Sequence, residues 1–160
     1  MAEISTADLY DERGHELQSL ALQLQNIGGV TGFSGQVRTI RCHQDNALVR
    51  STLNSPGEGA VLVIDGAGSL ETALVGDLIA GAAADNGWAG LIVHGAIRDR
   101  VALGTLPIGV KALGSNPAKS AKTGAGEIDV TVEFGGVRFE PGAFVWCDED
   151  GVLVTKSAEA

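Results

Sequence analysis

The sequence predicts an α/β fold, and three observations support that class. The continuous apolar run at residues 60–65 is typical of a strand buried on both faces of a sheet. A segment with helical periodicity follows at about residues 70–86, and a second strand-like run covers residues 90–94, which completes a βαβ unit. The second half of the chain then consists of short strand-like runs, so the sheet extends beyond that unit.

Before the βαβ unit, the pattern predicts a helical lead-in, a strand and a short helix. Residues 4–25 place leucines among charged residues, and Gly28 and Gly29 end the segment. Residues 35–42 are strand-like, and Asp45 or Asn46 can cap a helix over residues 47–53. The helical segment at 70–86 is either continuous or restarts at Gly76.

After the βαβ unit, strands are expected at 108–113, 128–134, 137–139, 143–147 and 152–155. Residues 114–127 form a long polar loop, and such a loop in a small domain is often functional or interfacial. We expect one domain over residues 1–156 and a frayed tail at 157–160.

Composition narrows the class of function. The chain has 160 residues and a formal charge of −9, and such an acidic surface repels nucleic acids and anionic membranes. No run approaches the roughly 18 apolar residues that span a bilayer, and the N-terminus lacks a signal-peptide pattern, so we expect a cytoplasmic protein. A local basic pocket for an anionic substrate remains possible, and its candidate residues are Arg98, Arg100, Lys111, Lys119 and Lys122.

The cysteines and histidines carry little functional signal. Cys42 and Cys147 lie in strand-like runs without CxxC spacing, so buried reduced thiols are favoured over catalytic or metal-binding thiols. His15, His43 and His94 form no metal-binding motif. His94 is interpreted as a satisfied core or interface histidine.

The best candidate site joins Gly76-Asp77 with Arg98-Asp99, which follow after twenty intervening residues. Adjacent Arg and Asp offer a guanidinium for a carboxylate and an acidic oxygen for a hard cation. If a helix starts at Gly76, its first main-chain N–H groups can also bind a carboxylate. The alternatives are an ordinary Gly-Asp turn and a surface ion pair.

Two other features have weaker functional interpretations. The loop that starts at Asp65 and includes Gly66 and Gly68 has the wrong spacing for a nucleotide or S-adenosylmethionine loop, so a sharp strand-to-helix turn is favoured. Lys119 and Lys122 are interpreted as ordinary loop charges.

Seven segments together resemble the RraA-like family over nearly the whole chain. They are 45–48 (DNAL), 61–69 (VLVIDGAGS), 76–77 (GD), 90–99 (GLIVHGAIRD), 108–112 (IGVKA), 124–127 (GAGE) and 134–137 (FGGV). That family includes class II 4-hydroxy-4-methyl-2-oxoglutarate aldolases, which also decarboxylate oxaloacetate, and the regulator of ribonuclease E activity A. The chain looks most similar to actinobacterial members formerly labelled menaquinone methyltransferases, although it lacks a methyl-donor motif.

The resemblance implies a swivelling β/β/α domain, layered as an α-β-β-α sandwich, in a homotrimer with active sites at subunit interfaces. It implies a divalent cation, Mg²⁺ or Mn²⁺, at Asp99 and a small 2-oxo acid substrate. Arg98 and the N–H groups of Gly76, Asp77, Leu78 and Ile79 would bind that substrate, with Arg98 and Asp77 as catalytic residues.

This sequence departs from the family's aldolases at one position. Ala102 replaces their acidic residue, which puts full aldolase efficiency in doubt. Glu127 and Asp129 are candidates to complete the site from a neighbouring subunit.

Two main functions therefore stay open. The first is a metal-dependent lyase, and the second is a non-catalytic regulator that binds a ribonuclease E-type partner. Retention of Asp99, which the ribonuclease regulator lacks, favours the lyase. Methyltransferase activity is the least favoured alternative.

Overall fold

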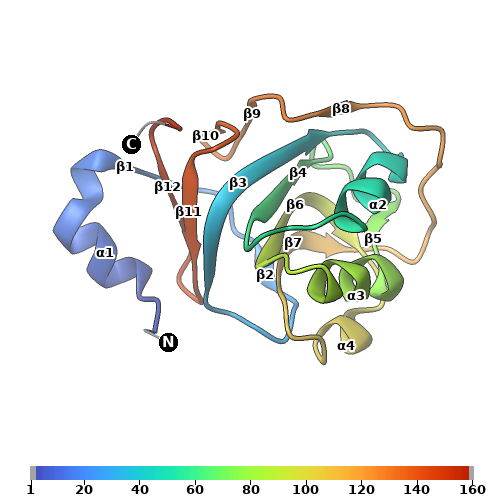
Figure 1. The fold of residues 1–160 in the computed structure, drawn as a ribbon, viewed down its shortest axis with the longest axis horizontal. Helices are drawn as coiled ribbons and strands as arrows, with labels where there is room; N and C mark the ends of the chain where they lie inside the picture. Colours follow the sequence, from blue (N-terminus) through green and yellow to red (C-terminus); the bar gives the residue numbers. More distant parts are fainter. Residues whose placement is uncertain (1–2, 159–160) are drawn as a thin grey trace.

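One ten-stranded sheet organises the computed structural model, which describes residues 3–158 (Figure 1). The elements in chain order are α1 (Thr6–Arg13), η1 (Gly14–Glu16), β1 (Leu17–Ser19), β2 (Gln25–Asn26), β3 (Phe33–Arg41), α2 (Ala47–Leu53), β4 (Val61–Asp65), β5 (Ala73–Val75), α3 (Asp77–Asp85), β6 (Gly90–Ile97), α4 (Arg100–Leu103), β7 (Gly109–Ser115), β8 (Glu127–Ile128), β9 (Val132–Phe134), β10 (Val137–Phe139), β11 (Phe144–Cys147) and β12 (Val152–Thr155). The main strand order is β1-β12-β11-β3-β4-β6-β7-β2, and β9 pairs separately with β10.

The long strand β3 belongs to both halves of this sheet. Its residues 33–36 pair antiparallel with β11, and its residues 37–41 pair parallel with β4. The antiparallel half is therefore β1-β12-β11-β3, and the parallel half is β3-β4-β6-β7 with β2 at its edge. Because the strand is shared, the two halves form a continuous sheet that folds over on itself.

The two halves and the helices form four layers. Helices α2 and α3 cover one face of the parallel half, the antiparallel half covers the other face, and α1 lies outside β12 (Figure 1). Strand β4 shows the alternation that this requires: Leu62 and Ile64 face the helices, whereas Val61 and Val63 face the antiparallel half. This mixed α/β arrangement confirms the predicted α-β-β-α sandwich.

Two glycines at the start of neighbouring strands permit close packing between the halves. A Cβ on Gly90 would lie 2.3 Å from the Phe33 ring, and one on Gly109 would lie 2.1 Å from it. The ring therefore lies directly against the backbone of β6 and β7, which brings the two halves of the sheet together.

Two predicted helical segments are wrong in part. In the lead-in expected to be helical over 4–25, only α1 and η1 are helical. The chain enters strand β1 at Leu17, and this strand pairs with β12. The helix expected from about residue 70 begins at Asp77, which confirms the restart at Gly76, and residues 73–75 form β5 beside β6. In both places long-range strand pairing overrides local helical periodicity.

Two strand predictions and one turn prediction also need correction. The strand expected to end at His94 continues to Ile97, so His94 lies inside β6. The run at 128–134 is divided into β8 and β9, with Asp129 in the left-handed region between them at φ 55°. The loop that includes Gly66 and Gly68 leads into β5, so it is not a strand-to-helix turn.

Three further expectations concern the two cysteines, the C-terminal tail at 157–160 and membrane-spanning segments. Cys42 and Cys147 are buried free thiols as predicted, and burial raises the pKa of Cys42 to about 12. Ser157 accepts a hydrogen bond from the Thr155 hydroxyl at 3.0 Å, while residues 159–160 of the expected tail lie outside the described residues. None of the helices within residues 3–158 combines the length and apolarity needed to cross a bilayer.

Candidate functional site

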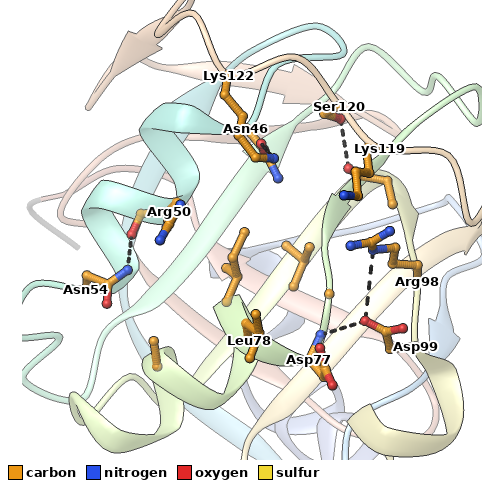
Figure 2. Close-up of a pocket in the computed structure, with 15 residues that line it drawn as sticks. Asn46, Arg50, Asn54, Asp77, Leu78, Arg98, Asp99, Lys119, Ser120 and Lys122 are labelled. Carbon is orange, nitrogen blue, oxygen red and sulfur yellow. Dashed lines mark hydrogen bonds and ion pairs between the residues drawn. The ribbon is translucent and has the colours of Figure 1, made fainter.

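A cavity of about 320 Å³ lies between α2, the start of α3, the end of β6 and the polar segment 116–124 (Figure 2). Its polar and charged lining consists of Asn46, Arg50, Asn54, Asp77, Arg98, Asp99, Lys119, Ser120 and Lys122. Val75, Leu78, Ile79 and Ala82 supply apolar surface.

Parallel pairing of β5 with β6 brings the two sequence motifs together. Val75 is paired with Ile97, and the Arg98 N–H donates to the Val75 carbonyl oxygen at 2.9 Å. Gly76 and Arg98 therefore leave the sheet at the same edge, where loops after parallel strands place functional groups. This pairing explains why two motifs separated by twenty residues line one cavity.

The Asp99 carboxylate lies at the N-terminus of α3. The Asp77 N–H donates to Asp99 Oδ2 at 3.0 Å, and Arg98 Nε lies 3.9 Å from the same oxygen. A Cβ on Gly76 would lie 2.8 Å from Oδ2, so the glycine permits this approach. The helix dipole and the guanidinium both favour a negative charge at this point.

Part of the binding capacity of this corner remains available to a ligand. The N–H groups of Leu78 and Ile79 lie in the first turn of α3 and have no acceptor within the helix. Arg98 donates from Nη1 to the Pro117 carbonyl oxygen at 3.3 Å, and 37% of its side chain is exposed. One of the four N–H groups predicted to bind substrate, that of Asp77, is instead occupied by Asp99.

A buried carboxylate attaches the polar segment 116–124 to the start of α2. Asp45 Oδ2 accepts from the Thr123 N–H at 2.8 Å, and Oδ1 accepts from the N–H groups of Gly124 and Ala47, each at 3.2 Å. The Thr123 hydroxyl also donates to Asp45 and is the main cause that lowers the pKa of this carboxyl to about 2.

Further main-chain contacts hold the same segment on both sides. Asn46 N–H donates to the Ala121 carbonyl at 3.0 Å, and the Ser120 hydroxyl donates to the Ala73 carbonyl at 2.7 Å. These contacts place Lys119 and Lys122 among the residues that line the cavity.

Other basic candidates lie elsewhere. Arg100 donates to the Ser115 hydroxyl at 3.3 Å and does not line the cavity. Lys111 is buried against Asn26 Oδ1 at 2.8 Å, and burial lowers the pKa of its ammonium.

Sequence reasoning did not identify Arg50 or Asn46 as cavity residues. Asn46 was considered as a helix cap and as part of the segment 45–48, and the structure shows no capping hydrogen bond from its side chain. The available signal was their spacing: residues four apart on a helix share one face.

The oxygens at the start of α3 suit a hard divalent cation. Within residues 3–158, Asp99 Oδ1 and both carboxylate oxygens of Asp77 accept no hydrogen bond. No cluster of three or more His, Cys, Asp or Glu side chains occurs in that range. A cation at Asp99 would thus have few protein ligands and keep several waters, which is the preference of Mg²⁺.

Glu127 and Asp129, the candidates to complete the site from a neighbouring subunit, lie outside this cavity. Ala102, which replaces the acidic residue of the family's aldolases, also lies outside it. Glu127 pairs with Arg41 at 3.0 Å and Asp129 pairs with Arg38 at 3.2 Å, so each carboxylate already has a partner in its own chain. Ala102 lies on the short helix α4 and lines a neighbouring open groove.

His94 has partners for its side chain within its own chain, as predicted. Its Nδ1 lies 3.0 Å from Asp65 Oδ1, and its ring stacks on Phe134.

The folded-over sheet, with the Asp-Arg-Asp corner at the carboxyl ends of β5 and β6, defines an α/β protein with a polar cavity at the edge of its parallel half. A family model described as RraA-like, Aldolase/RraA, matches residues 6–154. The chain belongs to the RraA-like family.

Solved structures from three organisms share this fold. A protein of Geobacillus kaustophilus described as an S-adenosylmethionine:2-dimethylmenaquinone methyltransferase is 49% identical, with 96% of each chain covered and a TM-score of 0.92. The RNA-processing inhibitor RraA of Thermus thermophilus is 47% identical over 98% of this chain and 94% of that one, with a TM-score of 0.93. Streptomyces coelicolor RraAS2, described as an unusual member of the RNase ES inhibitor RraA family, is 28% identical over 95% and 80%, with a TM-score of 0.76.

Proposed function

We propose that this protein is a divalent-metal-dependent carbon–carbon lyase. It cleaves 4-hydroxy-4-methyl-2-oxoglutarate by a retro-aldol reaction and decarboxylates oxaloacetate, both through a pyruvate enolate. The observation that carries the proposal is the position of Asp99, which lies at the N-terminus of α3 beside Arg98 and keeps one carboxylate oxygen without a partner among the described residues.

Asp99 would hold the cation, and the adjacent groups would bind the 2-oxo acid. The N–H groups of Leu78 and Ile79 and the Arg98 guanidinium offer hydrogen bonds to a carboxylate at the edge of the cavity. When bound, Mg²⁺ or Mn²⁺ supplies a Lewis acid that polarises the keto group.

Arg98 also acts on the charge that develops during bond cleavage. Breaking the carbon–carbon bond moves an electron pair toward the keto oxygen, and a fixed guanidinium stabilises that oxyanion more strongly in the transition state than in the substrate. The hydrogen bond to Pro117 restrains Arg98 in place. The same stabilisation serves retro-aldol cleavage and decarboxylation.

The two reactions differ in their need for a base. Retro-aldol cleavage removes the proton of the substrate hydroxyl, and Asp77, which has no partner for its carboxylate within residues 3–158, can accept it directly or through water. Decarboxylation needs no such base. With Ala102 in place of an acid, we expect decarboxylation of oxaloacetate to be the better retained activity.

The direct test is pyruvate release from each substrate with Mg²⁺, with Mn²⁺ and with EDTA. Asp99→Ala is the control for spontaneous decay of oxaloacetate, and Asp11→Ala on α1 is the matched control for loss of an exposed carboxylate outside the cavity. We expect metal-dependent turnover that Asp99→Ala abolishes and Asp11→Ala retains. Full metal-dependent turnover by Asp99→Ala would refute the cation assignment.

A second function, a protein-binding regulator of ribonuclease E-type RNA degradation, is supported by exposed apolar side chains near the cavity. Leu78 is 85% exposed and Val101 is 89% exposed, which is unusual for large apolar residues. One relative is described as an RNA-processing inhibitor, and another as a member of an RNase ES inhibitor family. This function predicts binding to such a ribonuclease without pyruvate release from either substrate, and Leu78→Ser with Val101→Ser would weaken the binding.

The same two residues support the homotrimer that the resemblance implies. Apolar groups beside a site are covered when another copy of the chain packs there, which also lets that copy complete the site. Light scattering after size exclusion should give a trimer for the protein and smaller species for the double serine variant. A monomeric protein would refute this arrangement.

A further inference from the structure

The proposed reactions end with a step for which the cavity has to supply a proton. Cleavage of the carbon–carbon bond leaves an enolate, and C3 of that enolate must gain a proton before pyruvate is complete. In retro-aldol cleavage Asp77 takes up a proton that it can return, but decarboxylation delivers none to the protein. A donor that serves both reactions must therefore carry its proton before the substrate binds.

Few of the side chains that line the cavity can give up a proton. The guanidinium groups of Arg50 and Arg98 stay protonated in proteins, and asparagine amides are too weakly acidic to act. The Ser120 hydroxyl already donates to a main-chain carbonyl oxygen at 2.7 Å. Two ammonium groups remain as donors, those of Lys119 and Lys122.

The two lysines differ in what holds their ammonium groups. Lys122 Nζ donates to Asn46 Oδ1 at 3.4 Å, and the Asn46 amide is itself anchored by donation from Nδ2 to the Leu74 carbonyl oxygen at 3.3 Å. Lys119 lines the same cavity, and its ammonium has no acceptor within residues 3–158. Lys119 therefore keeps its N–H donors for a bound molecule.

The main chain at Lys119 is fixed against strand β5. The Ala73 N–H donates to the Ala118 carbonyl oxygen at 2.8 Å, and Lys119 forms an isolated parallel bridge with Ala73. Bridge partners and residues two apart on a strand share one face, so Lys119 faces the same side as Ala73 and Val75, which both line the cavity. Figure 2 shows the Lys119 side chain among the residues that line it.

The segment that carries Lys119 also holds Arg98. Arg98 Nη1 donates at 3.3 Å to the carbonyl oxygen of Pro117, two residues before Lys119. At the other end of the same side chain, a Cβ on Gly76 would lie 3.4 Å from Arg98 Nε. The arginine thus extends from the start of α3 to the polar segment, and the group proposed to stabilise the enolate oxygen lies close to a free ammonium.

We propose that Lys119 is a catalytic residue, the acid that protonates C3 of the pyruvate enolate. The electron pair of the enolate carbon–carbon double bond takes a proton from the Lys119 ammonium, which completes the methyl group and restores the keto group at C2. The lysine is left as a neutral amine and regains its proton from water. The proposal rests on the proposed lyase function and adds the step that ends both reactions.

Exchange of the pyruvate methyl protons for deuterium isolates this step, because no carbon–carbon bond is made or broken. Proton NMR in D₂O with Mg²⁺ should show exchange by the wild type, and Lys119→Met should slow it about 100-fold, which is the usual contribution of an acid–base group. Carbon dioxide release from oxaloacetate should fall less than about fivefold, because it precedes protonation. Calorimetry should show pyruvate affinity within about fivefold of the wild type, the loss from one exposed charge.

Further variants separate proton transfer from charge. Lys119→Arg keeps the positive charge and cannot release a proton, so exchange should stay slow while carbon dioxide release matches the wild type. Methylamine added to Lys119→Ala should restore exchange in proportion to its concentration. Lys156→Met is the matched control: it removes an exposed lysine that contacts the His15 carbonyl oxygen, outside the cavity, and should change neither rate.

Several results would overturn the assignment. Wild-type exchange by Lys119→Met would do so, as would equal losses of exchange and carbon dioxide release that Lys119→Arg restores, since these would indicate an effect of charge alone. Slow exchange in Lys122→Met with normal exchange in Lys119→Met would assign the proton to Lys122. A wild-type protein that decarboxylates oxaloacetate without exchanging pyruvate would refute the acid and retain the lyase, whereas one that does neither would refute both.

Discussion

Ionisable groups in two regions of this molecule have different surroundings. Between the two halves of the sheet, Asp65 contacts His94 at 3.0 Å and Lys111 contacts Asn26 at 2.8 Å, so each polar group has a partner in its own chain. In the cavity at the start of α3, the side chain of Asp77 has no such partner among the described residues.

That difference separates polar groups that stabilise the fold from those that await a ligand. A polar group removed from water costs free energy unless it is hydrogen-bonded, so the interior between the sheet halves has to satisfy its own groups. The open cavity has no such requirement, and its side chains keep donors and acceptors for an anion or a cation. Substitutions in the two regions should therefore affect activity and stability in opposite proportions.

The largest effect on activity is expected from Arg98→Ala. It removes the guanidinium that binds the carboxylate and stabilises the developing oxyanion, so kcat/KM for pyruvate release should fall about 100- to 1,000-fold. Steady-state assays should show a higher KM and a lower kcat together, with an unchanged Tm. A loss confined to KM would limit Arg98 to substrate binding.

A smaller loss is expected from Gly76→Ala, because the new Cβ would lie 2.8 Å from Asp99 Oδ2 and displace that carboxylate. We expect a roughly tenfold to 100-fold loss of metal-dependent activity and a weaker response to Mg²⁺ titration. Gly81→Ala is the matched control, since a Cβ there meets nothing within 4 Å. Equal activity of both variants would show that the Asp77–Asp99 contact is dispensable.

Asp45→Asn tests the attachment of the polar segment to the start of α2. The amide cannot accept the hydrogen bonds from Thr123 and Gly124 with the strength of a carboxylate, so Lys119 and Lys122 should lose their fixed positions. We expect KM to rise by roughly tenfold, kcat to change less, and Tm to fall. An unchanged KM with a lowered Tm would make Asp45 purely structural.

The pH dependence of that Tm difference has a defined sign. Hydrogen bonding lowers the pKa of Asp45 from its ordinary 3.8 to about 2 in the folded protein. Its contribution to stability is therefore complete above pH 3.8 and is lost as the pH falls through about 2. Thermal unfolding of wild type and Asp45→Asn should differ at neutral pH and converge in strong acid, and a constant difference would contradict this assignment.

The smallest effect on activity is expected from His94→Phe, in the satisfied region. Pyruvate release should change by less than about twofold, because His94 does not line the cavity. Loss of the contact with Asp65 should lower the free energy of unfolding by about 1 kcal/mol, although stacking on Phe134 can continue. Chemical denaturation measures this change, and a large loss of activity without destabilisation would break the comparison between the two regions.

Local sequence patterns predicted the parallel unit well. The buried apolar run before Asp65 and the restart at Gly76 both correspond to observed elements, because burial on two faces and a glycine before a helix leave strong local signals. Periodicity failed at residues 17–19 and 73–75, where β1 and β5 form by pairing with β12 and β6. A three-residue strand has too few residues for its own pattern, so its partner determines it.

The sequence by itself determined the family, the layered α/β class and the identity of the residues in the Asp-Arg-Asp motif, because motif spacing and buried apolar runs are properties of the chain. Only the tertiary structure decided that Asp99 caps α3, that Asp45 holds the segment carrying Lys119 and Lys122, and that Arg50 faces the same cavity. Those relations join residues far apart in the chain, and they arise from sheet pairing and hydrogen bonds that no local pattern encodes.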